Sequence, residues 1–375
     1  MRPKYLVPAL LSFSMLGALV GLSEPSAALR EVPLRTPATT TREASAAARP
    51  ATTAAPVTCQ ELVGEVEGAF THAPTGEAAN ALHERIVVAS REASCREALD
   101  AAALRAPCGA GVGLVTSALF AGDGYPAVAT RKHVARAKEM LGRGDGSCLV
   151  AVLPSVQFAS DVDLHLADDV ASLAAMKDDN ARAAGWLTLG SLSFRAKTVG
   201  NTKLADTLNA RLLAGMRKFP HDAMVVDAAG NAGCESCTPA FDAARRDQDP
   251  WVRRTAASAY RFVTTKPAVA AMCASLHGDA HAAVREHAAW SLAFGANALP
   301  ARSACLVDAI RTDADVDVRR SAARALVNLA SVSPDASRAL LDLHGPELPR
   351  DVRIIVLEHL SAGDAPVVHE DPLKG

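Results

Sequence analysis

Four stretches of the chain repeat one short pattern at a nearly constant spacing. They are DQDPWVRRTAASAY (247–260), DAHAAVREHAAWSL (279–292), DADVDVRRSAARAL (313–326) and LPRDVRIIVLEHL (348–360). Aligned on the Val-Arg pair, the anchor residues are Val252, Val284, Val318 and Val352, which lie 32, 34 and 34 residues apart. A fixed period of this length is typical of stacked helical units that bury a face against their neighbours. The period therefore predicts a helical repeat array.

Each anchor is expected to begin a helix, because apolar residues follow it at helical spacing. Val318, Ala322, Ala325, Leu326 and Leu329 fall on one stripe of a 3.6-residue helix. Just upstream of most anchors lies an aspartate, which can cap the helix start and interact favourably with its dipole. The aspartates concerned are Asp249, Asp279 and Asp317.

Prolines form a second marker with the same period. Pro239, Pro267, Pro300 and Pro334 are 28, 33 and 34 residues apart, and each opens another apolar run. Proline is tolerated at the first position of a helix, because the N–H at that position has no hydrogen-bond partner within the helix. Each unit is therefore predicted to hold two helices, one begun by proline and one begun around Val-Arg.

The pattern extends upstream with more drift. Residues 203–219 are expected to form a first helix, and residues 178–192 and 221–233 second helices, the latter anchored near Met224. Residues 58–160 are also predicted to be largely helical, but without a clear period. We expect this N-terminal region to be either degenerate repeats or a cap.

The Asp, Val-Arg, Ala-Ala and Leu placement in residues 247–360 resembles HEAT repeats. The resemblance implies an all-α fold, a right-handed α-solenoid of HEAT-like helix pairs, with the repeats over 161–362. Such arrays mostly act as binding proteins, and the concave face, lined by second helices, is expected to bind a protein or peptide partner.

A narrower resemblance lies in residues 178–262. The strings AGWLTLGSL and DAAGNAG, followed by the Val-Arg-Arg-Thr-Ala-Ala helix, are similar to the helical superhelix of large lipid transfer proteins of the vitellogenin and microsomal triglyceride transfer type. This resemblance implies lipid binding or transfer, with a lipid or lipoprotein as partner, as the alternative function.

The first 28 residues are predicted to be an export signal. Arg2 and Lys4 precede an apolar run, and the small residues Ser26, Ala27 and Ala28 suit signal peptidase cleavage. The protein is thus expected to be periplasmic or secreted; the alternative is an uncleaved anchor over 5–23.

Composition predicts little order in the segment that follows the signal. Residues 29–57 are rich in Pro, Thr, Ala and Arg and are expected to be a disordered tether, and residues 363–375 a flexible tail.

The charge balance argues against nucleic-acid binding. Without residues 1–28 the chain keeps 37 of 39 Lys plus Arg and 40 of 41 Asp plus Glu, a net charge of −3. Nucleic-acid binding needs a basic stripe, which this composition does not suggest. We also find no Ser-His-Asp arrangement with a nucleophile elbow, so a non-catalytic protein without a cofactor is expected.

Eight cysteines fall in the exported part, and their even number favours disulfides in an oxidising compartment. They are Cys59, Cys95, Cys108, Cys148, Cys234, Cys237, Cys273 and Cys305. We expect sequential pairing. Cys234-Glu-Ser-Cys237 is interpreted as a structural disulfide in a turn between helices. A thiol-redox role for this CxxC is the second alternative function.

Two other clusters have weaker metal-binding interpretations. His277, His281 and His287 lack the spacing of a helical zinc pair and are expected to be turn and surface residues. Asp313, Asp315 and Asp317 alternate as calcium ligands do, but a calcium loop needs Gly and Glu where Val318 and Arg324 stand.

One glycine-rich motif and one set of arginines complete the candidates. Gly109-Ala-Gly-Val-Gly113 lacks the P-loop Lys and is expected to be a tight turn or close helix contact. One arginine per unit follows the anchor valine, and we favour a structural ladder of Arg-Asp pairs over a row of cations for an acidic partner. The ladder residues are Arg253, Arg285, Arg319 and Arg353.

Overall fold

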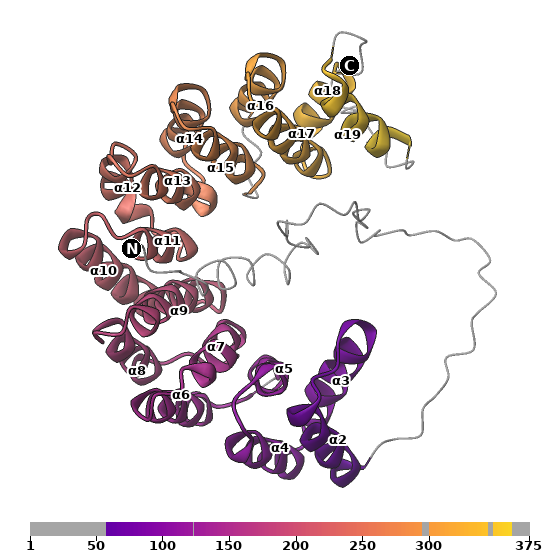
Figure 1. Ribbon diagram of the computed structural model, residues 1–375, viewed down its shortest axis with the longest axis vertical. Helices are drawn as coiled ribbons and strands as arrows, with labels where there is room; N and C mark the ends of the chain where they lie inside the picture. Colours follow the sequence, from indigo (N-terminus) through magenta and orange to yellow (C-terminus); the bar gives the residue numbers. More distant parts are fainter. Residues whose placement is uncertain (1–57, 123, 295–299, 344–347, 362–375) are drawn as a thin grey trace. The chain divides into compact units, whose positions relative to one another are not determined.

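A computed structural model describes residues 58–122, 124–294, 300–343 and 348–361 of the chain (Figure 1). Over these ranges the fold is built of α-helices and short 3₁₀ turns, without strands, which confirms the predicted all-α class. None of the helices in these ranges is both long and apolar enough to cross a membrane. The predicted signal (1–28), tether (29–57) and tail (363–375) lie outside the described residues.

The chain divides into two compact units between Val199 and Gly200. Each unit is a stack of helix pairs and is described separately. The sequence had placed the start of the repeats at residue 161, within the first unit.

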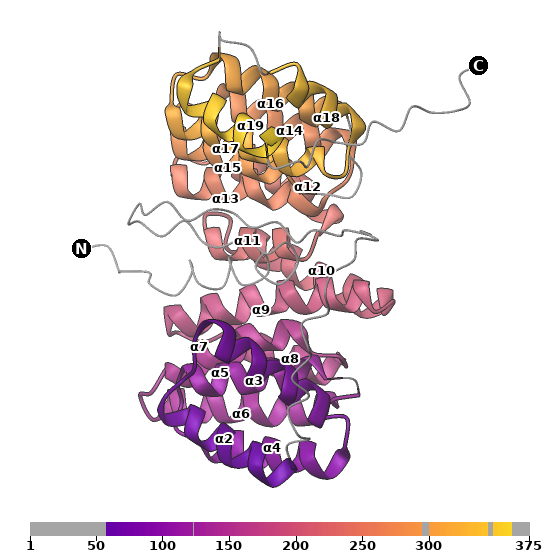
Figure 2. The same cartoon turned by 90° about the vertical axis from the view of Figure 1, so that its right-hand side faces the viewer.

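The C-terminal unit consists of five helix pairs. In chain order the helices are α10 (Thr202–Lys218), α11 (Ala223–Asn231), α12 (Thr238–Ala244), α13 (Pro250–Ala259), α14 (Lys266–Gly278), α15 (Ala282–Leu292), α16 (Pro300–Thr312), α17 (Val316–Ala330), α18 (Pro334–Leu341) and α19 (Arg350–Ser361). The second helices α11, α13, α15, α17 and α19 contact one another in succession. Figures 1 and 2 show them as one layer, with the first helices α10 to α18 forming the other. Residues 200–361 are therefore a helical solenoid.

The anchor valines form the interior of this stack. Val252, Val284, Val318 and Val352 are at most 2% exposed and lie in α13, α15, α17 and α19. The four marker prolines lie in the first turns of α12, α14, α16 and α18. Both sequence markers therefore predicted the helix pairs correctly.

One upstream anchor was placed one residue too early. Asp222 caps α11 by accepting a hydrogen bond from the Met224 N–H, as Asp249 caps α13 by accepting one from Trp251 N–H. The residue three positions after the cap is Val225, which is fully buried, whereas Met224 is half-buried. Val225 therefore corresponds to the anchor valines, one residue after Met224, near which the sequence had placed the anchor.

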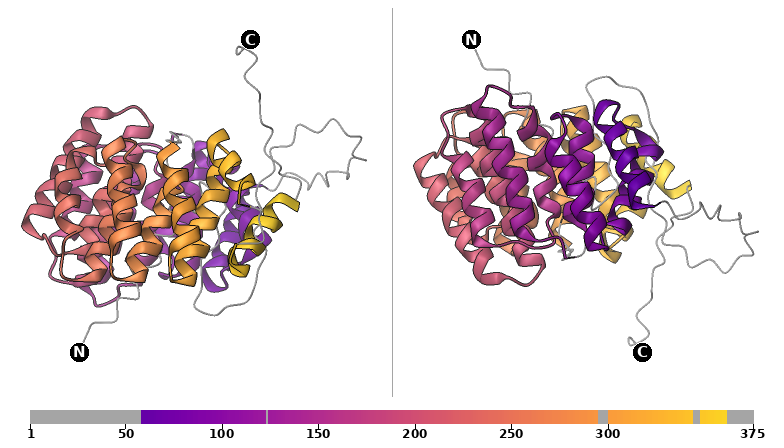
Figure 3. Two further views of the ribbon diagram at one scale, coloured as in Figure 1. Left: turned by 90° about the horizontal axis from the view of Figure 1, so that it is seen from above. Right: turned by 90° about the horizontal axis from the view of Figure 1, so that it is seen from below.

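The N-terminal unit is built on the same principle. Its elements are α2 (Cys59–Thr71), α3 (Gly76–Ala89), α4 (Ala93–Arg105), α5 (Ala110–Ala121), α6 (Ala127–Gly142), α7 (Ser147–Val152) with the 3₁₀ helix η1 (Leu153–Phe158), α8 (Leu164–Ala174) and α9 (Asp179–Thr198). Helices α2, α4, α6 and α8 contact one another in succession, and so do α3, α5, α7 with η1, and α9. Figure 3 shows the helices side by side within each unit. Residues 58–160, where the sequence showed no period, thus also form stacked helix pairs.

Glycines allow the closest approaches between helices. An added Cβ would lie 2.2 Å from the Ala69 carbonyl oxygen at Gly111, 2.4 Å from the Ala174 nitrogen at Gly185, and 2.6 Å from the Ala259 Cα at Gly230. Real Cβ atoms cannot approach backbone so closely without displacing it. Gly111 lies in the Gly109–Gly113 motif, which is a close helix contact, as expected.

We predict that Gly230→Ala destabilises the C-terminal unit by about 1–3 kcal/mol, because the new methyl group overpacks the contact between α11 and α13. Gly64→Ala is the matched control. Gly64 also lies inside a helix, with no atom within 4 Å of an added Cβ, so this change should stabilise the protein by about 0.5–1 kcal/mol. Denaturant unfolding of both variants checks the prediction, and equal effects would contradict it.

Candidate binding surface

An arginine-aspartate ladder joins successive repeats of the C-terminal unit. Arg253 donates to Asp279 through Nε at 2.8 Å and Nη2 at 3.1 Å. One repeat later, Arg285 donates to Asp313 at 2.8 and 3.0 Å in the same bidentate manner. The planar guanidinium suits this two-point contact with a carboxylate. The arginines that follow the anchors are thus occupied by the next repeat, as the structural interpretation expected.

Each ladder arginine also binds the turn that precedes its own helix. The Arg285 Nη1 donates to the carbonyls of Asp279 at 3.0 Å and Ala280 at 3.4 Å. Arg253 makes equivalent bonds to the carbonyls of Asp247 and Gln248. One side chain therefore satisfies carbonyls in the turn inside its own helix pair and binds the corresponding turn of the next pair.

The ladder aspartates organise the start of the second helices. Asp279 accepts the N–H of His281 at 2.9 Å, and Asp313 accepts the N–H of Asp315 at 2.9 Å. Such bonds to the residue two positions on stabilise a tight turn. Each of these aspartates thus binds the preceding repeat's arginine and its own repeat's turn.

The ion pairs keep the ladder carboxylates charged despite partial burial. Burial alone would raise the pKa of Asp313, but hydrogen bonds from Arg285 and the Asp315 N–H, with the positive charge of Arg285, hold this pKa below its ordinary value. The same balance lowers the pKa of Asp279 beside Arg253. The hydrogen bond to Asp313 in turn raises the pKa of Arg285.

The ends of the ladder depart from this pattern. Upstream, Asp247 pairs with His221 Nδ1 at 2.5 Å instead of an arginine. Downstream, Arg319 reaches Asp351 at 3.3 and 3.4 Å. Arg353 donates to the carbonyl of Leu348 at 3.2 Å.

The structure corrects the predicted helix caps. Asp249 caps α13, but the residue at the cap of α15 is His281, and the cap of α17 is Asp315. Asp279 lies two residues before the cap and binds Arg253, while Asp317 lies in the first turn of α17. The error arose because the sequence offers aspartates at several offsets from the anchor, and a hydrogen bond from the helix start distinguishes the cap from the rest.

The two clusters with possible metal ligands serve other purposes. Asp313 pairs with Arg285, Asp315 caps α17, and Asp317 lies 3.7 Å from Arg320. Among the described residues, no three or more His, Cys, Asp or Glu side chains come together as metal ligands.

The three histidines have separate environments. His277 lies 3.4 Å from Asp308, and His281 is exposed. Burial, assisted by the charges of Arg254 and Arg261, lowers the pKa of His287 to about 3. His287 is half-buried within α15, with its ring centroid 5.8 Å from that of Trp290, so it is neither a turn residue nor fully exposed.

The cysteines lie in four sequential pairs at disulfide distance. Three of them, Cys59–Cys95, Cys108–Cys148 and Cys273–Cys305, span 36, 40 and 32 residues. These separations are close to the repeat period, so each pair joins neighbouring helix pairs. The spacing of the cysteines was therefore a signal of repeats in residues 58–160 that the sequence analysis missed.

The CxxC pair has a local role. Cys234 and Cys237 have their Cα atoms 5.3 Å apart, in the turn between α11 and α12. Both side chains are fully buried. A redox-active dithiol must be reached by its substrate, and burial opposes this.

A buried polar cluster, which the sequence analysis did not find, lies beneath the second helices. Arg261 is 3% exposed and donates to Asp227 at 3.3 Å, to Asn231, and to the Ser258 carbonyl at 2.8 Å. Asp227 and Asn231 lie one turn apart on α11, so both face the same guanidinium. Their i, i+4 spacing within DAAGNAG was the available signal.

A second unpredicted cluster lies in the N-terminal unit. The Asp100 carboxylate accepts hydrogen bonds from Tyr125 and from His133 Nε2, the latter at 2.7 Å. Tyr125 and His133 are each 1% exposed. Burial, strengthened by the Asp100 charge, raises the pKa of Tyr125 far above its ordinary value. This network links α4 to α6 and is structural.

Opposite the buried stripe, three adjacent second helices present large and charged side chains. Two and six residues beyond the anchor a helix has turned by about 200° and about 240°, so these positions face away from the first helices. We call the side chains there, with those just before the anchor, the second-helix surface. It comprises Trp251 and Arg254 of α13, Glu286 and Trp290 of α15, and Asp317, Arg320 and Arg324 of α17.

The aromatic residues of this surface are accessible and paired with polar groups. Trp251 is 45% exposed, and the Arg254 guanidinium lies 4.9 Å from its ring centroid. Trp290 is half-buried and packs on Phe294, with ring centroids 4.5 Å apart. Exposed tryptophan beside arginine is the composition typical of binding hot spots.

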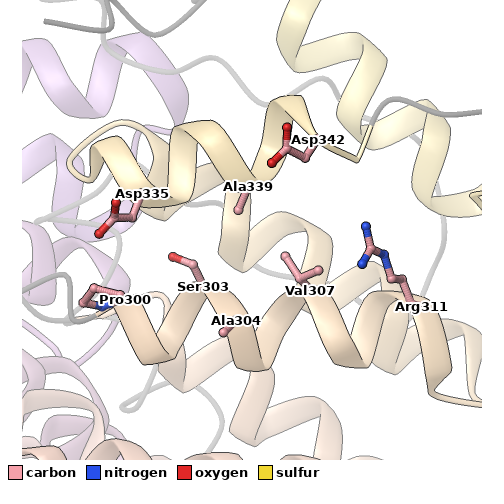
Figure 4. Close-up of a pocket in the computed structure, with 8 residues that line it drawn as sticks. All are labelled: Pro300, Ser303, Ala304, Val307, Arg311, Asp335, Ala339 and Asp342. Carbon is pink, nitrogen blue, oxygen red and sulfur yellow. The ribbon is translucent and has the colours of Figure 1, made fainter. Parts of the chain in front are cut away.

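The first-helix layer carries a shallow groove of about 320 Å³ between α16 and α18 (Figure 4). Its lining residues are Pro300, Ser303, Ala304, Val307 and Arg311 on α16, and Asp335, Ala339 and Asp342 on or next to α18. The groove holds no aromatic residue, unlike the second-helix surface.

Stacked helix pairs with a repeating internal ladder define a helical repeat protein. Residues 212–293, from within α10 to the end of α15, match the family of HEAT repeats. This match, together with the helical fold, supports HEAT-like repeats over residues 212–293. Comparison with curated proteins gave no significant match. The resemblance to large lipid transfer proteins remains a prediction.

We predict that Arg285→Gln lowers the free energy of unfolding by about 2–4 kcal/mol, because it leaves Asp313 without its cation and two turn carbonyls without a donor. Arg320→Gln, which removes an exposed pair with Asp317, is the control and should cost about 0.2–1 kcal/mol. Urea unfolding measures both, and equal losses would show that the ladder is not a structural element.

A second prediction concerns the cysteine pairs, because a disulfide stabilises a protein by lowering the entropy of the unfolded chain. Replacing Cys273 and Cys305 together by Ser opens a loop of 32 residues and should cost about 4 kcal/mol, whereas replacing Cys234 and Cys237 should cost about 2 kcal/mol. Unfolding under oxidising conditions provides the measurement. Thiols that titrate in denatured, unreduced protein would contradict the pairing.

Proposed function

We propose that this protein is exported and that its second-helix surface binds a protein or peptide partner, so that it acts as a scaffold. HEAT repeats form helical scaffolds whose long surfaces commonly serve protein interactions. The observation that carries the proposal is the Trp251–Arg254 pair, which projects from a rigid helix beside Glu286 and Trp290.

The ladder supports this assignment by elimination. Arg253, Arg285 and Arg319 are engaged within the fold, so they are not the cations offered to a partner. The side chain immediately after Arg253 remains for binding. Arg254 has a partly buried guanidinium whose Nε lacks a hydrogen-bond partner among the described residues.

The structure also offers another explanation for the strings that suggested lipid transfer. Gly185 in AGWLTLGSL and Gly230 in DAAGNAG lie where a side chain would collide with the backbone of a neighbouring helix. Both glycines are accounted for by helix packing, so we favour a polypeptide partner. Export is supported by the four cysteine pairs at disulfide distance.

Site-specific photo-crosslinking in the natural host tests the proposal. A photoreactive residue replacing Trp251 or Arg320 should crosslink to a discrete polypeptide. The same residue at Arg311 or Arg338, on the first helices α16 and α18, is the control and should not. Crosslinks confined to the first-helix positions, or to extractable lipid at the second-helix positions, would overturn it.

A further inference from the structure

The charges left unpaired on the second-helix surface are mostly positive. Asp317 and Arg320 form a pair 3.7 Å apart. Arg254 and Arg324 form no ion pair within the described parts of the chain, and the Glu286 carboxylate accepts no hydrogen bond there, although its backbone carbonyl accepts one from the Ser321 hydroxyl. The surface therefore offers two arginines and one glutamate to a partner.

The single glutamate, Glu286, repels an acidic partner only weakly. Glu286 lies between Arg254 and Arg324, both of which act on it electrostatically. Burial, with the charges of Asp315 and Asp317, nevertheless raises its pKa. Its negative charge is thus held at a cost and is opposed by the charges of the two arginines.

The helix spacing sets the distance between the two cationic positions. Packed helices lie about 8–10 Å apart, so Arg254 on α13 and Arg324 on α17, with α15 between them, are separated by about 20 Å. An extended chain advances about 3.3 Å per residue. About six residues of extended peptide therefore span the two arginines.

We propose that the partner is an extended acidic segment with two carboxylates about six residues apart, one bound by Arg254 and the other by Arg324. This inference rests on the proposed function. An apolar side chain four residues after the first carboxylate lies on the same face of the extended segment and packs on Trp290, and Trp251 covers the first carboxylate's arginine. Both aromatic residues exclude water from the ion pairs and strengthen them.

Charge distinguishes this partner from the chain's own tether. Residues 29–57 carry Arg30, Arg35, Arg42 and Arg49 against only Glu31 and Glu43. A net positive segment does not complement Arg254 and Arg324. The tether is therefore excluded as the occupant, and the partner that we infer is an acidic polypeptide segment.

Fluorescence anisotropy with synthetic peptides tests the inference on the full oxidised chain. The probe is a labelled peptide of about twelve residues with two glutamates six positions apart, a phenylalanine four positions after the first glutamate, and Ser and Thr elsewhere. The matched peptides carry lysines at the glutamate positions, or the same two glutamates side by side. The glutamate-spaced peptide should bind most tightly, and its affinity should fall as salt is raised.

Substitutions on the two helix layers test which residues bind the peptide. Arg254→Gln and Arg324→Gln should each weaken the spaced peptide about five- to tenfold, while Glu286→Gln should strengthen it about two- to fivefold. Arg311→Gln removes the same charge from the first-helix layer and should change nothing.

Three outcomes would overturn the inference: tighter binding of the lysine peptide, no binding of the spaced peptide at millimolar concentration, or equal effects of Arg254→Gln and Arg311→Gln. If Trp251 still crosslinks to a polypeptide in those cases, the proposed function stands and only the acidic chemistry fails. If the crosslink is absent, the proposed function itself fails.

Discussion

The pairing of one arginine with the aspartate of the following repeat is the interaction on which the C-terminal unit depends. The guanidinium of Arg285 spans two turn carbonyls of its own repeat and the carboxylate of Asp313 in the next. Asp313 then holds the turn that starts α17. Apolar stripes alone allow helices to slide and rotate, because the hydrophobic effect is not directional. Directional hydrogen bonds at each junction fix the position and orientation of successive pairs.

This ladder also determines which side chains are free to bind. The residue directly after each anchor valine forms bonds inside the stack. The residue two positions after the anchor projects away from the stack. Arg253 and Arg254 are adjacent in the chain, yet one is bidentate with Asp279 and the other lies over Trp251. In the N-terminal unit, Cys59–Cys95 and Cys108–Cys148 join neighbouring helix pairs covalently at comparable separations. In the C-terminal unit, which carries the proposed binding surface, the Cys273–Cys305 pair adds such a covalent junction to the ion pairs of the ladder.

Much of the fold followed from the sequence, because burial and helix initiation leave local signals. Val252 and its equivalents, and prolines such as Pro267, predicted the pairs of α12 to α19 at nearly their observed positions. For residues 58–160 the sequence left degenerate repeats and a cap as alternatives, because no short motif recurs there and the helix pairs are joined by contacts such as Cys59–Cys95 and Arg131–Asp169.

The candidate site was harder to predict, for a physical reason. The sequence identified Arg253 and Arg285 as a recurring set, but it could not show that Arg254 lacks a partner. Which of two adjacent arginines is engaged depends on the turn of the next repeat, about 26 residues away in the chain for Arg253 and Asp279. The Arg261 cluster was hidden for the same reason, since Asp227 lies 34 residues from it.

A double-mutant cycle on Arg285 and Asp313 tests the central claim most directly. Arg285→Gln, Asp313→Asn and the double variant would be unfolded in urea, and the coupling energy taken from the four free energies of unfolding. We predict a coupling of about 1.5–3 kcal/mol, because the pair is largely shielded from solvent and bidentate. A coupling indistinguishable from zero would mean that the repeats are held in place without the ladder, and would contradict the account.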